Sequence, residues 1–128
     1  MGVVPLFAGY DLRRRQGRIW KFDVTGGRYE EADFDATGSG GLYAKESLKK
    51  LHDPQASKVD SLETAIRALQ NAADEDRGTG GIDTVRGIFP TVIFCSRAGI
   101  EQAREPEISP WHDGLDALDR IDRRRVRR

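Results

Sequence analysis

The sequence predicts a layered domain of strands and helices, in the α/β or α+β class. Residues 18–25, RIWKFDVT, place Trp20, Phe22 and Val24 on one face, with the period of two that is typical of a half-buried strand. Residues 62–73 instead carry apolar side chains at the spacing of an amphipathic helix. The chain has 128 residues, which is the length of a single domain.

The strands begin near the N-terminus. Val3 to Ala8 form a short apolar run that Gly9 ends, and residues 18–25 follow as the second strand. Gly26-Gly27 supplies the turn of a hairpin. The chain then returns through residues 28–37, RYEEADFDAT, whose last part resumes the alternation at Phe34 and Ala36. We therefore expect a hairpin that leads directly into a glycine-rich turn.

The first predicted helix follows that turn. Ala44, Leu48 and Leu51 recur at helical spacing, and Ser39 is expected to cap the helix N-terminus. Pro54 excludes a continuous helix through the next segment.

The second predicted helix carries the clearest pattern in the chain. Asp60 and Glu63 have the spacing of a capping box. The apolar stripe that follows consists of Leu62, Ala65, Ile66, Leu69, Ala72 and Ala73. We expect this helix to stop in the acidic, glycine-rich segment 74–81, DEDRGTGG.

The remaining third of the chain divides at Pro106. Residues 85–95, VRGIFPTVIFC, predict one largely buried strand with a bend at Pro90, and a short strand pair is expected around Gly99. Beyond Pro106, six of the last nine residues are arginine. That tail could bind nucleic acid or a partner, but it has no interleaved aromatics for base stacking, which favours a solvated tail partly neutralised by its own aspartates.

Composition excludes several classes of protein. Basic and acidic residues both number 21, so the formal net charge is zero and no global field favours nucleic acid or an anionic membrane. Cys95, the single cysteine, lies in an apolar run and is expected to be a buried thiol. No segment approaches the ~20 apolar residues of a spanning helix, and no export signal is recognisable. We expect a cytoplasmic protein that contacts no membrane.

The turn ATGSGG does not fit the known glycine-rich site motifs. A dinucleotide fingerprint requires a third glycine where Tyr43 stands, and a Walker loop requires Gly-Lys followed by Ser or Thr, which never occurs. A serine-hydrolase elbow requires a glycine at the position of Thr37. Nucleotide binding and serine-hydrolase chemistry are therefore not expected.

Metal and cofactor binding are not expected either. His52 and His112 are far apart in sequence, and one cysteine cannot build a structural zinc site. The acidic residues 74–76 lack the alternating spacing of a calcium loop. Taken alone, Asp76 and Thr79 could belong only to a turn in which the aspartate accepts from its own backbone.

Four stretches in one order resemble a known family. They are PLFAGYD, GRIWKFDVTGGRYEE, ATGSGGLYAKESLKKL and TAIRALQNAADEDRGTGGIDTVRGIFPT. From about Val4 to about Gly99 the chain is similar to the second half of a 20S proteasome β subunit of the actinobacterial type. The resemblance implies an α+β fold, the αββα sandwich of N-terminal nucleophile hydrolases, here incomplete, with strands and one helical layer. It divides the chain into a proteasome β-type part, residues 1–105, and a divergent Asp/Arg-rich tail, residues 106–128.

The resemblance also implies an activity and its residues. In the family, a threonine at the mature N-terminus is the nucleophile of an endopeptidase, and its own α-amino group serves as the base. A serine from a Gly-Ser-Gly turn and an Asp-x-x-Ser/Thr pair orient that amine. The matching residues here are Ser39, Asp76 and Thr79, with Gly38 and Gly40 shaping the turn. The implied partners are proteasome α and β subunits in stacked heptameric rings, with protein or peptide substrates and no cofactor.

The residues that match the family do not include its nucleophile. We therefore expect this chain to cleave no peptide by itself, and we expect its apolar strands to be incompletely covered, so that it is poorly soluble or associates with another chain. The alternative is a non-catalytic assembly or interaction module that uses the same packing surfaces.

Overall fold

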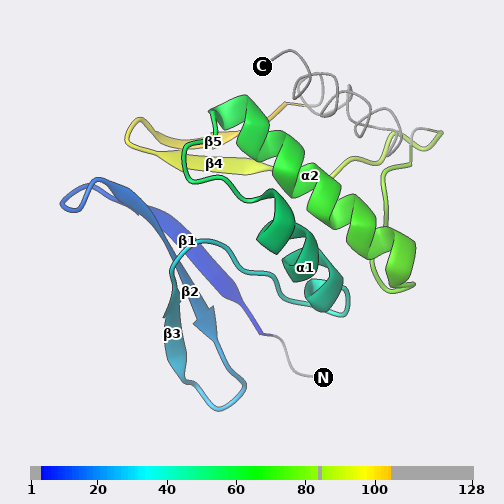
Figure 1. The fold of residues 1–128 in the computed structure, drawn as a ribbon, viewed down its shortest axis with the longest axis horizontal. Helices are drawn as coiled ribbons and strands as arrows, with labels where there is room; N and C mark the ends of the chain where they lie inside the picture. Colours follow the sequence, from blue (N-terminus) through cyan, green and yellow to red (C-terminus); the bar gives the residue numbers. More distant parts are fainter. Residues whose placement is uncertain (1–3, 84, 105–128) are drawn as a thin grey trace.

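A computed structural model describes residues 4–83 and 85–104 of the chain. In these residues, a three-stranded antiparallel sheet comes first, with strands β1 (Leu6–Asp11), β2 (Gln16–Phe22) and β3 (Arg28–Glu31) in sequence order (Figure 1). Helices α1 (Gly41–Leu51) and α2 (Lys58–Glu75) follow. Strands β4 (Ile93–Ser96) and β5 (Gly99–Gln102) form a second antiparallel pair.

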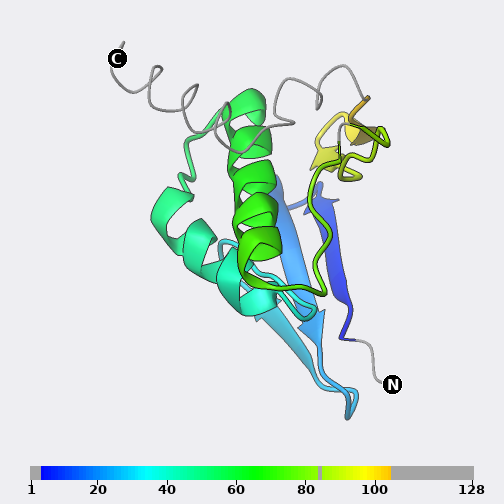
Figure 2. The ribbon, with the colours of Figure 1, turned by 90° about the vertical axis from the view of Figure 1, so that its right-hand side faces the viewer.

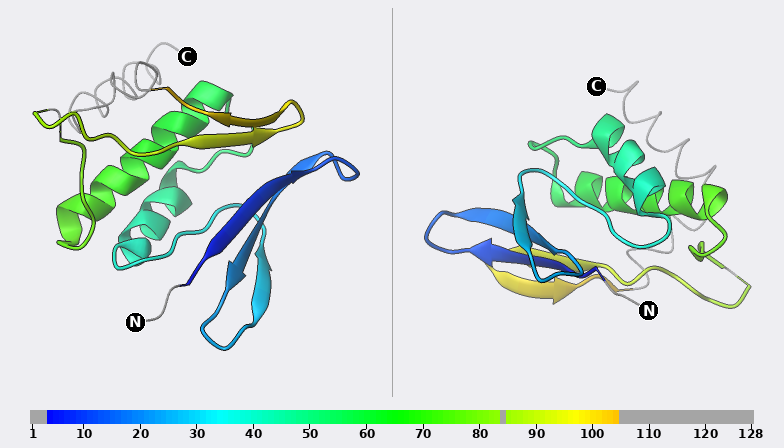
Figure 3. Two further views of the ribbon diagram at one scale, coloured as in Figure 1. Left: turned by 180° about the vertical axis from the view of Figure 1, so that it is seen from behind. Right: turned by 90° about the horizontal axis from the view of Figure 1, so that it is seen from below.

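The two helices form one layer, and both sheets lie on the same side of it (Figures 2 and 3). Strands and helices are segregated along the chain, so the α+β class is confirmed. Strands with a single helical layer agree with the incomplete αββα sandwich expected from the sequence. Neither described helix combines the length and apolar content that crossing a bilayer requires.

The first sheet contains the predicted hairpin but with shifted ends. Strand β2 stops at Phe22 rather than Thr25, because Asp23 turns the chain: its Oδ1 accepts from the amides of Thr25 and Gly27 at 3.0 and 2.7 Å. Strand β1 runs from Leu6 to Asp11 rather than from Val3 to Ala8, since its pairing with β2 extends to Asp11 opposite Gln16.

The expected continuation of the third strand is wrong. Strand β3 ends at Glu31, and Phe34 and Ala36 lie in an irregular segment that crosses from the sheet to the helical layer. A crossing segment cannot remain in the ladder of its sheet. Its backbone is instead held by side chains, among them Lys21, whose Nζ donates to the carbonyl of Ala36 at 3.2 Å.

Both predicted helix caps are also wrong. Gly40, which has no side chain, occupies the N-cap of α1, and Ser39 stands one position earlier, where its hydroxyl donates to Asp76. Helix α2 begins at Lys58, and its cap is Ser57, whose Oγ accepts from the amide of Asp60 at 3.1 Å. The capping-box spacing from Asp60 to Glu63 thus lies within the helix rather than at its start, and Glu63 is buried.

The core consists of two small clusters on either side of α2. Leu62, Ile66 and Ala103 form one cluster, against which Phe94 and three other partly buried residues pack. Ala44 of α1 meets Ala68 and Ala72 of α2 in the other. Because alanines line this second contact, the two helices can lie close together. The glycine-rich turn at the start of α1 is thereby brought towards the C-terminal end of α2.

The last strands are shorter than the sequence predicted. Residues 85–95 are not one buried strand: Ile88 makes only an isolated bridge with Asp83, and β4 starts at Ile93. Ile88 is 51% exposed and Ile93 is 56% exposed. Cys95 is partly rather than fully buried, and the strand pair around Gly99 is confirmed. The Asp/Arg-rich tail, residues 106–128, lies outside the described residues.

We expect the buried stripe of α2 to dominate the stability of the helical layer. Ile66 is 1% exposed, so truncation to alanine should lower the free energy of unfolding by about 2–5 kcal/mol. Urea denaturation followed by circular dichroism measures this loss. Leu69→Ala is the matched control, because Leu69 lies on the same helix but is 43% exposed, and its loss should be clearly smaller. Equal losses in the two variants would contradict this description of the core.

Candidate functional site

Two hydroxyl groups from different parts of the chain converge on one carboxylate. Ser39 Oγ donates to Asp76 Oδ2 at 2.6 Å, and Thr79 Oγ1 donates to the same oxygen at 2.7 Å. Ser39 lies in the turn before α1, and Asp76 is the C-cap of α2. The structure therefore brings together the three residues that the sequence singled out, although 37 positions separate Ser39 from Asp76.

The C-terminal end of α2 and the turn that follows it bring Asp76 and Thr79 next to each other. The amide of Asp76 donates to the carbonyl of Ala72 at 2.8 Å, which completes the last helical turn. The backbone of Asp76 is then extended, and the amide of Thr79 donates back to the Asp76 carbonyl at 3.2 Å. This turn leaves the Asp76 carboxylate facing outward from the helix end, where a hydroxyl from α1's leading turn can reach it.

Two glycines allow the two segments to approach each other. A Cβ on Gly40 would overlap Thr79 Oγ1 and would lie 3.2 Å from the Cβ of Ala72. A Cβ on Gly78 would lie 2.7 Å from Ser39 Oγ. Gly40 was identified from the sequence, whereas Gly78 was missed, although its position between Asp76 and Thr79 was an available signal. Gly38 shapes the turn differently, because its φ of 97° suits glycine.

Hydrogen bonding lowers the pKa of Asp76 below its ordinary value. The Ser39 hydroxyl is the largest cause, followed by the Thr79 hydroxyl, and the amides of Gly78 and Thr79 act in the same direction. Partial desolvation opposes them but does not prevail. The carboxylate is therefore ionised at neutral pH and is a weak base.

This arrangement is an acceptor site rather than a nucleophile with its base. A hydroxyl that donates its proton to a carboxylate leaves its oxygen lone pairs available to accept a hydrogen bond. The Asp76 carboxylate is too weak a base to activate the Ser39 hydroxyl for attack. Ser39 and Thr79 can therefore hold an N–H group, such as an amine, at the side of the carboxylate.

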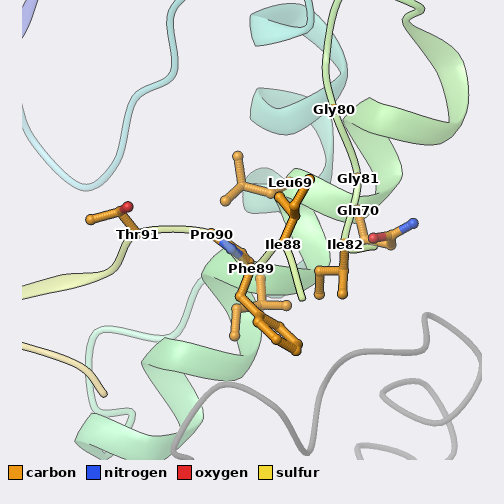
Figure 4. Close-up of a pocket in the computed structure, with 10 residues that line it drawn as sticks. Leu69, Gln70, Gly80, Gly81, Ile82, Ile88, Phe89, Pro90 and Thr91 are labelled. Carbon is orange, nitrogen blue, oxygen red and sulfur yellow. The ribbon is translucent and has the colours of Figure 1, made fainter. Parts of the chain in front are cut away.

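The site opens onto a cavity of about 510 Å³. Ser39, Gly40 and Thr79 form its polar end, and the small residues of the α1–α2 contact, among them Ala68 and Ala72, form an apolar wall. A smaller pocket of about 320 Å³ is lined by Leu69 and Gln70 of α2, by Gly80-Gly81 and by residues 88–91 (Figure 4). Within residues 4–83 and 85–104, no group of three or more metal-ligating side chains is found.

Comparison with known proteins identifies the family. The proteasome subunit family matches residues 1–86, which is well over half of the chain. The chain belongs to the proteasome subunit family. The resemblance inferred from the four sequence stretches is thus confirmed.

Three curated relatives of this proteasome chain are named proteasome subunit beta. The protein from Saccharomonospora viridis is 57% identical over 98 residues, covering 73% of this chain and 34% of its own length. The protein from Streptomyces griseus is 45% identical over 109 residues, covering 85% of this chain and 39% of its own. The protein from Jonesia denitrificans is 39% identical over 125 residues, covering 98% of this chain and 41% of its own. The chain thus spans roughly two-fifths of the length of these relatives or less.

The bond from Ser39 should be visible in the titration of Asp76. Ser39→Ala removes the largest cause of the lowered pKa, so the pKa of Asp76 should rise towards its ordinary value. Carbon-13 NMR titration of the Asp76 carboxyl measures the shift. Ser61→Ala, at an exposed position on α2, is the matched control and should leave the pKa of Asp76 unchanged. Folding lowers this pKa, so the carboxylate stabilises the fold above pH ~3.9 and ceases to do so as the pH falls through the folded-state value.

Gly40 lies so close to Thr79 and Ala72 that position 40 should have no room for a side chain. Gly40→Ala introduces a methyl group against Thr79 Oγ1 and Ala72, and we expect a loss of about 1–3 kcal/mol in the free energy of unfolding. Gly80→Ala is the control in the same region, because its Cβ would meet nothing within 4 Å, and its effect should stay within about 0.5 kcal/mol. Urea denaturation of both variants makes the comparison. A Gly40→Ala variant as stable as the parent would show that the two segments lie further apart.

Proposed function

We propose that this chain is the part of a proteasome β-type subunit that holds the amine of an N-terminal threonine nucleophile. The threonine would come from a part of the subunit other than these 128 residues, since the matched relatives are more than twice as long. The observation that carries the proposal is the pair of hydroxyls on Asp76 Oδ2. That pair faces a cavity large enough to admit a segment of chain.

The chemistry follows from the needs of an alcohol nucleophile. A threonine hydroxyl attacks a peptide carbonyl slowly at neutral pH unless a base takes its proton. A free α-amino group has a pKa of about 7.7–8.0, so a useful fraction is unprotonated at neutral pH. Ser39 Oγ would accept an N–H bond from that amine while donating its own proton to Asp76. The amine lone pair would then be directed towards the threonine hydroxyl, whose proton it removes.

Asp76 and Thr79 act on the amine through Ser39 in this proposal. The carboxylate fixes the direction of the Ser39 proton, and Thr79 holds the carboxylate by donating to the same oxygen, Oδ2. Gly38 and Gly40 shape the turn. The reaction is peptide-bond hydrolysis in protein or peptide substrates, through an ester on the threonine that water then cleaves.

The proposed setting is the assembled proteasome. Membership of the family supports assembly into proteasome complexes, and we infer α and β subunits in stacked heptameric rings in the cytoplasm as the finer arrangement. Substrate preference depends on residues outside this chain.

A non-catalytic assembly or interaction module remains the second candidate. It is favoured by the exposure of large apolar side chains on the strands: Phe7 is 60% exposed and Ile100 is 80% exposed. Exposed apolar strands pair readily with another chain.

The experiment starts from the protein recovered from its native cells. Intact mass and N-terminal sequencing should show a longer chain that begins with threonine. A chain that begins at Met1 or Gly2 would favour the non-catalytic module instead.

In that longer protein, Ser39→Ala should lower kcat for a fluorogenic peptide about 10- to 100-fold, the order expected for one lost hydrogen bond to a charged group. The KM should change less, because Ser39 acts on the nucleophile rather than on the substrate. Ser61→Ala serves again as the control. Unchanged turnover in Ser39→Ala would remove the proposed role of this hydroxyl.

A further inference from the structure

A buried carboxylate lies four residues before Ser39. The side chain of Asp35 is 0% exposed, and its Oδ1 accepts from the amide of Ala36 at 2.7 Å. The same oxygen lies 3.1 Å from the Nζ of Lys45 and 3.4 Å from the Nζ of Lys21. Lys45 belongs to α1 and Lys21 to β2, so Asp35 joins the helical layer to the first sheet.

Further contacts anchor the residues that follow Asp35. Lys21 Nζ also donates to the carbonyl of Ala36 at 3.2 Å, and Thr37 Oγ1 donates to the carbonyl of Val4 at 2.8 Å. Residues 35–37 are therefore held by the chain leading into β1, by β2 and by α1. The anchored segment ends two residues before Ser39.

Beyond that segment, the contacts of Ser39 itself are its hydrogen bond to Asp76 and the close approach of Gly78. Ser39 is exposed, and a Cβ built on the neighbouring Gly38 would meet nothing within 4 Å. The turn itself is closed by the amide of Gly41, which donates to the Gly38 carbonyl at 3.0 Å. Whether the Ser39 hydroxyl can reach Asp76 therefore depends on where residues 35–37 are held and on where α1 begins.

Asp35 is a costly way to stabilise the fold. Its Oδ2 is buried and has no hydrogen-bond partner in the described part of the chain. Burying a charge with an unused acceptor is less favourable than burying an apolar side chain of similar volume. The ion pairs of Asp35 with Lys21 of β2 and with Lys45 of α1 are directional, however, and they specify where residues 35–37 lie. That balance favours a role in placement over a role in stability.

We propose that Asp35 is a positioning residue for Ser39: its pairing with Lys21 and Lys45 holds the start of the 36–40 turn between β2 and α1, where Ser39 Oγ reaches Asp76. The inference rests on the proposed function only where it gives a purpose to the contact between Ser39 and Asp76. The contact itself belongs to this chain and can be measured without turnover.

The test is the titration of Asp76 in the full chain carrying Asp35→Asn. Asparagine keeps the size of the side chain and an acceptor for the Ala36 amide, but it removes the charge that holds the lysines. If Ser39 is displaced, the pKa of Asp76 should rise as it does in Ser39→Ala, measured by carbon-13 NMR. Loss of a negative charge acting through space would lower the pKa of Asp76 instead, so the sign of the shift separates the two effects.

The matched control is Glu46→Gln, which makes the same chemical change in an exposed ion pair with Lys49 on α1. It should not raise the pKa of Asp76. If Asp35→Asn does not fold, Asp35→Asn combined with Lys45→Met keeps the net charge constant and replaces a partly buried ion pair by less polar groups. Its control is Glu46→Gln combined with Lys49→Met. The first double variant should raise the pKa of Asp76 and the second should not.

Two outcomes overturn the inference. One is an Asp76 pKa that is unchanged or lowered in folded Asp35 variants while Ser39→Ala raises it. The other is an Asp76 pKa that Ser39→Ala leaves unchanged. The first leaves the proposed function intact, since the Ser39 contact would then be real but otherwise positioned. Conversely, a raised pKa in the Asp35 variants together with unchanged turnover in Ser39→Ala would remove the proposed function and leave the positioning role standing.

Discussion

The site depends on the close approach of the turn before α1 to the C-terminal end of α2. Ser39 can reach Asp76 only because no side chain separates the two segments: Gly40 lies against Thr79, and Gly78 lies against Ser39. Helices α1 and α2 also pack closely against each other, because their contact contains Ala44, Ala68 and Ala72. Small residues at these positions are therefore required for the two segments to come this close.

The same approach explains why helix α1 has no side-chain cap. Serine is a favoured N-cap residue, and Ser39 stands one position before the cap of α1. The cap position itself is occupied by Gly40, where a side chain would overlap Thr79, so no side chain is present there to accept from the first amides of the helix. The Ser39 hydroxyl donates its proton to the ionised Asp76 carboxylate, and such a bond is stronger than one between neutral groups. The helix begins at Gly40 and Gly41 instead, and the hydroxyl oxygen is left free to accept.

Side-chain burial differs between the helical layer and the strands. Ile66 and Ala72 of α2 are almost fully buried, whereas Phe7 of β1 and Ile100 of β5 are largely exposed. A three-stranded sheet and a two-stranded pair beside one helical layer leave strand edges without partners in the described part of the chain. Matches to relatives that are more than twice as long agree with this asymmetry, because such proteins have further chain with which to cover these surfaces.

The sequence by itself determined the elements whose signals are local. The periodicity of residues 62–73 predicted α2, the alternation around Trp20 predicted β2, and Gly26-Gly27 predicted the hairpin turn. The order of four motifs was sufficient to name the family and, through it, Ser39, Asp76 and Thr79. Tertiary structure decided what depends on contacts between distant residues. The cap of α1, the end of β3, the need for glycine at position 78 and the pairing of Asp35 with two lysines all arise where the sheet meets the helices, and no local pattern encodes the distance between them.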